Sequence, residues 1–192
     1  MTGIRNITKK LIAVLVTAVL LCTPALAQPA VDAANARARL ELLKKYRHDD
    51  EVRQILFISH TRVSSAIAWY YEKKSDTGAW TLVFQTDAYT GINGMDKREE
   101  GDGRTPSGEY TVTGAFGRLP DPGTRLPYIP LTPSTYACSE DCEWYNRIID
   151  TNVTGHLCRG ESMWIDSPAY DYGLTIDYNA SNTYPNGYNL GG

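Results

Sequence analysis

The stretch that decides the fold is Glu100-Gly-Asp-Gly-Arg-Thr-Pro-Ser-Gly-Glu-Tyr110, which is followed by Thr111-Val-Thr113. Three glycines and one proline fall within eight positions of this stretch: Gly101, Gly103, Pro106 and Gly108. Because glycine tolerates positive φ and proline fixes φ, the run predicts a loop of defined shape. The β-branched residues that follow predict a strand. The stretch therefore indicates a fixed loop that leads into a β-sheet.

Outward from this loop, short β-type runs alternate with turn residues on both sides. The predicted strands cover residues 55–58, 65–71, 80–84, 109–115 and 172–178. The turn Ser75-Asp-Thr-Gly78 predicts a hairpin between the second and third of them. Many short strands at regular spacing are typical of an all-β sandwich or barrel. The fold class is accordingly predicted to be mainly β.

Two other segments differ from this pattern of short strands and turns. Residues 31–47 are rich in Ala, Arg and Leu and predict a short N-terminal helix, with Ala36, Leu40, Leu43 and Tyr46 on its apolar face. Residues 119–136 contain five prolines, so we expect no regular element there and a long irregular excursion instead.

The N-terminus has the features of a secretory signal peptide. Arg5, Lys9 and Lys10 precede an apolar run over 11–21, and Ala25-Leu-Ala27 fits the small-residue cleavage pattern. The apolar run is shorter than the roughly 20 residues that span a bilayer. We therefore expect cleavage after Ala27, export to the periplasm or to the extracellular space or cell wall, and no stable membrane insertion afterwards. Uncleaved anchoring and lipidation at Cys22 are the alternatives.

Charge argues against a nucleic-acid partner. Cleavage would reduce the 19 basic residues to 16 and leave all 22 acidic residues, so the net charge would move from −3 to −6. Nucleic-acid binding favours a basic face, which this composition does not supply. The remaining 165 residues suffice for one domain with a hydrophobic core.

Four further segments accompany the loop at 100–110 in a family-like order. They are Gly91-Ile-Asn-Gly94, Ala115-Phe-Gly117, Tyr145-Asn146 and Tyr172-Gly-Leu-Thr-Ile-Asp-Tyr-Asn179. Together they resemble the L,D-transpeptidase (YkuD-like) catalytic domain, whose signature reads EGDGKTP-x-G-x-Y. The resemblance covers roughly residues 53–192. It divides the chain into a signal peptide (1–27), an N-terminal helix and linker (28–52) and an L,D-transpeptidase-like domain (53–192).

The resemblance implies a β-sandwich and a role in bacterial cell-wall biogenesis. In such transferases a cysteine thiolate, paired with a histidine, attacks the stem peptide of peptidoglycan, and a second stem resolves the thioester into a 3→3 cross-link. The chemistry implies no cofactor and no metal, and the partners are peptidoglycan stem peptides. The residues expected to shape the substrate cleft are Asp102, Arg104, Thr105, Pro106, Gly108 and Tyr145.

The family's catalytic residues have no counterpart in this sequence. In the family a G-S-x-I-F-x-H segment and an S/T-x-G-C loop follow the Asp-Tyr-Asn region, whereas this chain reads Tyr184-Pro-Asn-Gly-Tyr-Asn-Leu-Gly-Gly192 and stops. We therefore assign no catalytic residue and expect a truncated, inactive fragment of the domain. Exposed sheet edges would leave it poorly folded. A secreted, non-catalytic wall-binding module is the alternative, and the sequence leaves open whether the chain is an enzyme.

Three cysteines remain after cleavage, Cys138, Cys142 and Cys158. In an exported protein this number favours one disulfide and one free thiol, with the pairing left open. A zinc site formed by the three cysteines and His156 is a second hypothesis, because it offers four suitable ligands. A catalytic role for Cys158 is a third. It is disfavoured because Leu157 stands where the family has glycine and because the segment precedes the Asp-Tyr-Asn strand.

Overall fold

The computed structural model describes residues 10–16, 27–74, 77–157 and 160–179. Contacts group the chain into two compact units, one of residues 1–97 and 103–111, the other of residues 98–102 and 112–192. The sequence predicted one domain over 53–192, and the boundary between the units falls inside a single strand, β5 (Gly108–Gly117).

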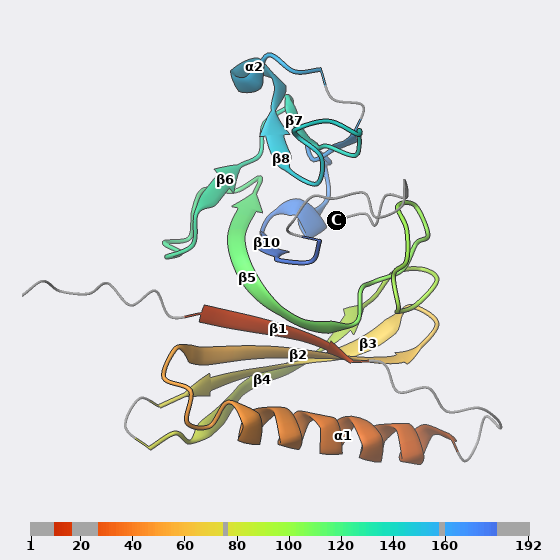
Figure 1. The fold of residues 1–192 in the computed structure, drawn as a ribbon, viewed down its shortest axis with the longest axis vertical. Helices are drawn as coiled ribbons and strands as arrows, with labels where there is room; N and C mark the ends of the chain where they lie inside the picture. Colours follow the sequence, from red (N-terminus) through yellow and green to blue (C-terminus); the bar gives the residue numbers. More distant parts are fainter. Residues whose placement is uncertain (1–9, 17–26, 75–76, 158–159, 180–192) are drawn as a thin grey trace, which may run out of the picture. The chain divides into compact units, whose positions relative to one another are not determined.

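The first unit is a twisted sheet covered by a helix (Figure 1). Its strands follow the order β5-β1-β2-β3-β4, with β1 parallel to β2 and the other neighbours antiparallel. Residues 108–111 of β5 pair with β1. The remaining strands are β1 (Lys10–Val16), β2 (Val52–Arg62), β3 (Ser65–Lys73) and β4 (Trp80–Tyr89).

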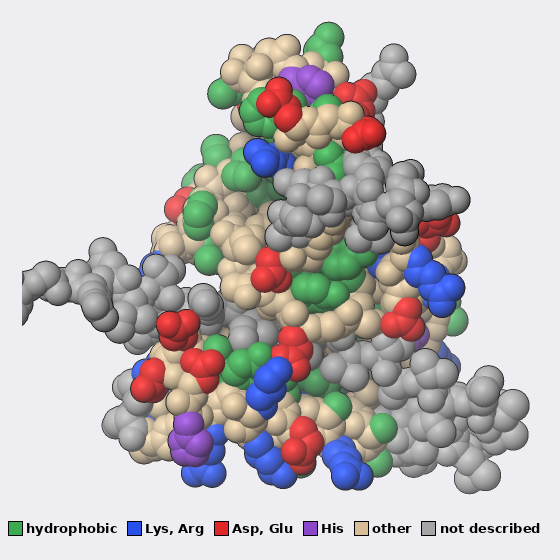
Figure 2. Space-filling view, viewed as in Figure 1, with side chains coloured by type: hydrophobic (Ala, Val, Ile, Leu, Met, Phe, Trp, Pro, Cys, Tyr) green, Lys and Arg blue, Asp and Glu red, His purple; other side chains and the backbone are tan. Residues whose placement is uncertain are grey.

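The core of this unit lies between the sheet and α1 (Ala27–Lys45), which Figure 1 shows along one face of β2–β4. Leu42 of α1 and five buried residues of β2 and β3 form the core cluster. Two of these five are Phe57 and Trp69, whose rings meet edge to face. Alternate residues of β2 are buried, as a strand with one covered face requires. Over α1, Figure 2 shows basic and acidic side chains intermingled.

The predicted apolar face of the helix was partly wrong. Leu43 and Tyr46 pack against the core as predicted, but Leu40 is 56% exposed and Leu42, not assigned to that face, is 6% exposed. The buried face includes Asn35 and Arg39, whose guanidinium lies 4.3 Å from the ring centroid of Trp69. Because polar residues lie on the buried face, the spacing of apolar residues alone does not identify that face of the helix.

A buried lysine from the sheet caps the C-terminal end of α1. Lys73 Nζ donates to the carbonyl oxygens of Tyr46, at 2.6 Å, and of Asp49. Burial, together with the charge of Arg53, lowers the pKa of Lys73. The ammonium group thus binds carbonyls of the segment that directly follows α1, and a cation at this end complements the helix dipole.

The second unit contains the rest of β5 and a separate small sheet. Residues 112–116 of β5 pair with β10 (Gly173–Ile176). The C-terminal end of β5 runs parallel to β6 (Tyr128–Pro130). The small sheet has the order β8-β7-β9 and is antiparallel. Its strands are β7 (Thr135–Ala137), β8 (Ile148–Asp150) and β9 (Glu161–Ser162), with the helices α2 (Thr151–Thr154) and η1 (Pro168–Tyr170) nearby in sequence.

The structure confirms the mainly β class and all five predicted strands, most of them longer than predicted. The expectation of no regular element over 119–136 was wrong, because β6 and the start of β7 lie there. Short strands on a sheet's margin tolerate proline, which explains Pro130 in β6.

Several predictions fall on residues outside the described ranges. These are most of the signal peptide, part of the 75–78 turn, Cys158 and the segment 180–192. Within the signal-peptide range, residues 10–16 form β1. None of the helices in the described part of the chain is both long and apolar enough to span a membrane.

Candidate functional site

In the first unit, residues 103–105 of the loop are hydrogen-bonded to the Gly91-Ile-Asn-Gly94 turn. The Gly91 N–H donates to Thr105 Oγ1 at 2.7 Å, and the Thr105 N–H donates to the Gly94 carbonyl at 2.9 Å. The Asn93 N–H donates to the Gly103 carbonyl, also at 2.9 Å. Two segments that carry the family resemblance thus form one hydrogen-bonded element, and Thr105 is its central residue.

Close backbone approach explains one glycine of this element. A Cβ on Gly91 would lie 2.3 Å from the Gly103 carbonyl oxygen and 2.7 Å from Arg104 Cα. Gly103 itself has φ 66°, a left-handed conformation that favours glycine. The glycines therefore let the turn and the loop meet backbone to backbone.

The other predicted cleft residues of the first unit also have structural contacts. Arg104 is exposed, and its Nη1 donates to the Met95 carbonyl at 2.9 Å. Ser107 Oγ donates to Asp96 Oδ1 at 2.7 Å, which holds the backbone around the half-buried Pro106. Gly108 has φ 144°, and a Cβ there would lie 2.9 Å from the Tyr110 hydroxyl.

Asp102 and Tyr145 belong to the second unit. Asp102 Oδ2 accepts from the Arg98 N–H at 2.7 Å, so it stabilises the turn before it. Tyr145 is 1% exposed, and its hydroxyl accepts from Asn179 Nδ2 at 3.3 Å. Tyr145 is therefore a core residue here and presents no surface to a substrate.

A second pair of resembling segments is also in contact. Asn146 Nδ2 donates to the carbonyl oxygens of Tyr178, at 3.4 Å, and Asn179, at 3.1 Å. The Tyr145-Asn146 pair and the Asp177-Tyr-Asn179 segment are more than 30 residues apart in sequence. Each unit therefore joins two of the segments on which the resemblance rests.

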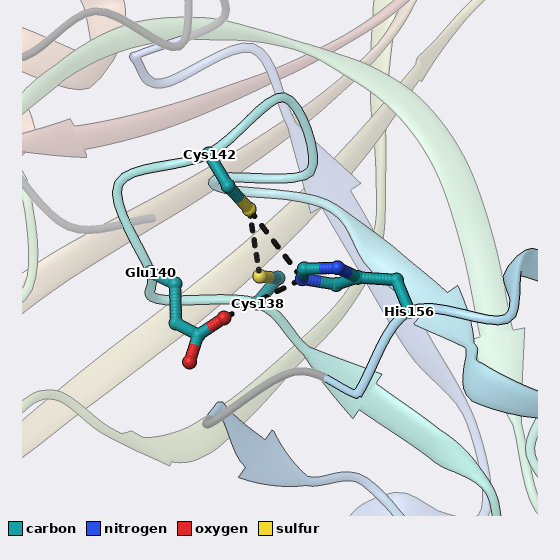
Figure 3. Close-up of side chains that lie close together, drawn as sticks. All are labelled: Cys138, Glu140, Cys142 and His156. Atoms are coloured by element: carbon teal, nitrogen blue, oxygen red, sulfur yellow. Dashed lines mark hydrogen bonds and ion pairs between the residues drawn. The ribbon is translucent and has the colours of Figure 1, made fainter.

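Four side chains with ligand atoms converge in the second unit: Cys138, Glu140, Cys142 and His156 (Figure 3). His156 Nε2 lies 3.6 Å from Cys142 Sγ and 3.4 Å from Glu140 Oε2. Cys142 Sγ lies 3.8 Å from Cys138 Sγ. Cys138 is buried, whereas the other three are half-buried. We call these four residues the Cys–Glu–His cluster.

The cysteines differ in their oxidation state. Cys138 is disulfide-bonded, and Cys142 carries a free thiol. The sequence left the pairing open among three cysteines, and the structure identifies Cys142 as a free thiol. The arrangement makes Cys142 a thiol next to a disulfide sulfur.

The hairpin loop between β7 and β8 positions three members of the cluster. The Cys138 N–H donates to the Arg147 carbonyl at 2.9 Å, and the Asn146 N–H donates back to the Cys138 carbonyl at 2.8 Å. Asn146 has φ 57°, a conformation that asparagine tolerates better than most residues. Inside the loop, the Tyr145 N–H donates to the Cys142 carbonyl at 3.1 Å. These bonds fold the Cys138–Cys142 segment into a compact turn.

Helix α2 positions the fourth member. Asp150 begins this helix as its N-cap, and Gly155 ends it in the left-handed conformation with φ 69°, directly before His156. Hydrogen bonds from the hydroxyls of Ser134, at 2.7 Å, and Thr132, at 2.8 Å, lower the pKa of Asp150. The charged carboxylate is therefore the form that holds β7, β8 and the start of α2 together.

The sequence missed Glu140 as a member of this cluster. The hypothesis of a zinc site included Cys138, Cys142 and His156, which the structure brings together, and Cys158, which lies outside the described residues. No local signal singles out Glu140, because a second acid, Asp141, lies beside it between the same two cysteines. The imidazole nitrogen of His156 faces Cys142, the cysteine to which no catalytic role was given.

No family model matches the chain, and no match was found among curated proteins or solved structures.

Proposed function

We propose that the chain is an exported, wall-associated protein of the L,D-transpeptidase type that binds peptidoglycan stem peptides and does not itself turn them over. The observation that carries this proposal is the Gly91–Thr105 hydrogen bond, at 2.7 Å, between two segments of the resemblance. The second contact of this kind, between Asn146 and Asn179, supports it. Within each unit, hydrogen bonds therefore hold two resembling segments together, as a binding surface built from those segments requires.

Cysteine acyl transfer is the competing function, and one observation favours it. Cys142 has a free thiol 3.6 Å from an imidazole nitrogen, within reach of a proton transfer. However, the same nitrogen also faces Glu140 Oε2 at 3.4 Å. In a thiol–imidazole–carboxylate triad the acid contacts the opposite ring nitrogen and orients the base. The geometry therefore supports binding better than turnover.

Sedimentation of the full chain with purified sacculi tests the proposal. We expect the protein to co-sediment and a free tetrapeptide stem to compete. Arg104→Gln removes an exposed cation from the 100–110 loop and should weaken co-sedimentation, whereas Arg62→Gln, an exposed arginine at the end of β2, should not. Failure of the wild-type chain to co-sediment would contradict the proposal.

A carbapenem, which acylates the nucleophile of this family, separates binding from turnover. We expect no covalent adduct on intact-protein mass spectra. An adduct that maps to Cys142 and disappears in Cys142→Ser would establish the acyl-transfer function in place of simple binding.

A further inference from the structure

We propose that the Cys–Glu–His cluster is a redox-controlled zinc site. In the reduced protein, Cys138 Sγ, Glu140, Cys142 Sγ and His156 Nε2 would bind one Zn²⁺. All four ligand atoms lie within 4.8 Å of one another, and Figure 3 shows the side chains pointing toward a common centre. The inference does not depend on the proposed wall-binding function.

The spacing of the ligand atoms fits tetrahedral zinc. Bonds of about 2.3 Å to sulfur and about 2.1 Å to nitrogen or oxygen give tetrahedral edges of about 3.8 Å for S–S, about 3.6 Å for S–N and about 3.4 Å for N–O. The corresponding distances are 3.8 Å for Cys138–Cys142, 3.6 Å for Cys142–His156 and 3.4 Å for His156–Glu140. Three edges of the tetrahedron are therefore already formed.

Hydrogen bonding alone accounts poorly for the position of His156. Its Nε2 faces both a sulfur and a carboxylate oxygen. One ring nitrogen carries either one proton or one lone pair, so it can satisfy only one of these neighbours. A cation between the atoms would satisfy the imidazole lone pair, the carboxylate and the sulfurs at once.

The donor set selects the metal. Two thiolates and an imidazole favour zinc over the oxygen-seeking ions Mg²⁺ and Ca²⁺. Four protein ligands fill a tetrahedral zinc and leave no position for substrate, which is the arrangement of a structural site. Such a site would fasten the β7–β8 loop to the segment that follows α2.

Redox control follows from the disulfide at Cys138. A sulfur in a disulfide is not a thiolate ligand, so the oxidised chain lacks one of the four donors. A dithiol reductant would cleave the bond, leaving thiols on Cys138 and its partner, and would itself become a cyclic disulfide. Zinc would then displace the protons of the Cys138 and Cys142 thiols to solvent. Metal binding and the disulfide exclude each other.

The test compares the oxidised and reduced full chain. The protein is reduced with dithiothreitol, desalted without oxygen, and titrated with Zn²⁺ against a chromophoric chelator, and elemental analysis gives the stoichiometry. We expect one zinc per reduced chain and an affinity at least about 100-fold lower for the oxidised chain. Co²⁺ in place of zinc should give a thiolate charge-transfer band and the visible spectrum of a tetrahedral ion. A reduced chain that takes up no metal, or equal affinity in both states, would refute the proposal.

Variants identify the ligands. Cys142→Ser and His156→Gln should each weaken zinc binding by about 100-fold or more, and Glu140→Gln by about 10-fold or more. Glu143→Gln, an exposed acid in the same loop, is the matched control and should leave binding unchanged. In the reduced state Cys158→Ser should also leave it unchanged. Loss of zinc in Cys158→Ser with retention in Glu140→Gln would overturn the assignment of Glu140.

Discussion

The Gly91 N–H donates a 2.7 Å hydrogen bond to the side-chain oxygen of Thr105, across a sequence separation of 14 residues. This bond joins the turn at 91–94 to the loop at 100–110. The Thr105 N–H, in turn, donates to the Gly94 carbonyl, so the threonine is held from both its side chain and its backbone. The Thr105 hydroxyl is therefore one of the groups that fix the shape of the loop.

Replacing that hydroxyl tests its contribution. Thr105→Val keeps the volume but removes the acceptor, so a partly buried Gly91 N–H loses its partner, and we expect a loss of about 1–3 kcal/mol in the free energy of unfolding. Thr105→Ser keeps the oxygen and should lose clearly less. Urea denaturation of both variants measures the difference, and equal losses would show that the hydrogen bond contributes nothing.

A second prediction concerns the loss of stability when a side chain is added at the closely packed Gly91. In Gly91→Ala the new methyl group would lie 2.3 Å from the Gly103 carbonyl oxygen, so the backbone must move, and we expect a loss of more than about 2 kcal/mol. Gly101→Ala is the comparison, because no atom lies within 4 Å of its Cβ position and only the strain of φ 75° opposes it. Thermal melts of the two variants should rank Gly91→Ala as the less stable.

A third prediction concerns the contribution of Lys73, near the C-terminal end of α1, to stability. Lys73→Met keeps the length of the side chain but leaves the Tyr46 and Asp49 carbonyls without its ammonium group. We expect a loss of about 1–3 kcal/mol in unfolding free energy. Lys74→Met, its exposed neighbour, should change stability by less than about 0.5 kcal/mol. A similar result for both variants would show that capping by Lys73 is unimportant.

The pKa of Asp150 predicts a dependence on acid. Because the folded state lowers this pKa through the hydroxyls of Ser134 and Thr132, the charged carboxylate stabilises the fold. That contribution is present above the unfolded value of about 3.9 and is lost as the pH falls through the lowered folded pKa. The stability difference between wild type and Asp150→Asn should therefore shrink below about pH 4. The exposed Asp141→Asn variant controls for the loss of one negative charge.

The strands could be predicted from sequence because their signals are local. Runs of β-branched and aromatic residues between turn residues located β2 to β5, and β2 shows the alternation of a half-covered strand. The helix face could be predicted only in part, because Arg39 is placed by the ring of Trp69, a contact between residues 30 apart. The short strands β6 to β9 carry no period long enough to recognise.

The cluster was only partly predictable for the same reason. Cys138, Cys142 and His156 could be grouped by residue type, but Glu140 is one of 22 acidic residues and nothing local distinguishes it. Its role depends on the turn of the β7–β8 loop and on the left-handed Gly155 that directs His156 toward it. Both features belong to the tertiary structure, which cannot be predicted from composition or residue spacing.

Strand β1 (Lys10–Val16) lies within the range predicted to be a signal peptide. It supplies the neighbour of β2 on one side and of β5 on the other, through residues that belong to the predicted leader. If a peptidase cuts after Ala27, both neighbours lose their shared partner and become unpaired borders. Cleavage would then change the conformation of the sheet, and the order of folding and cleavage would decide whether β2 and β5 ever share a partner strand.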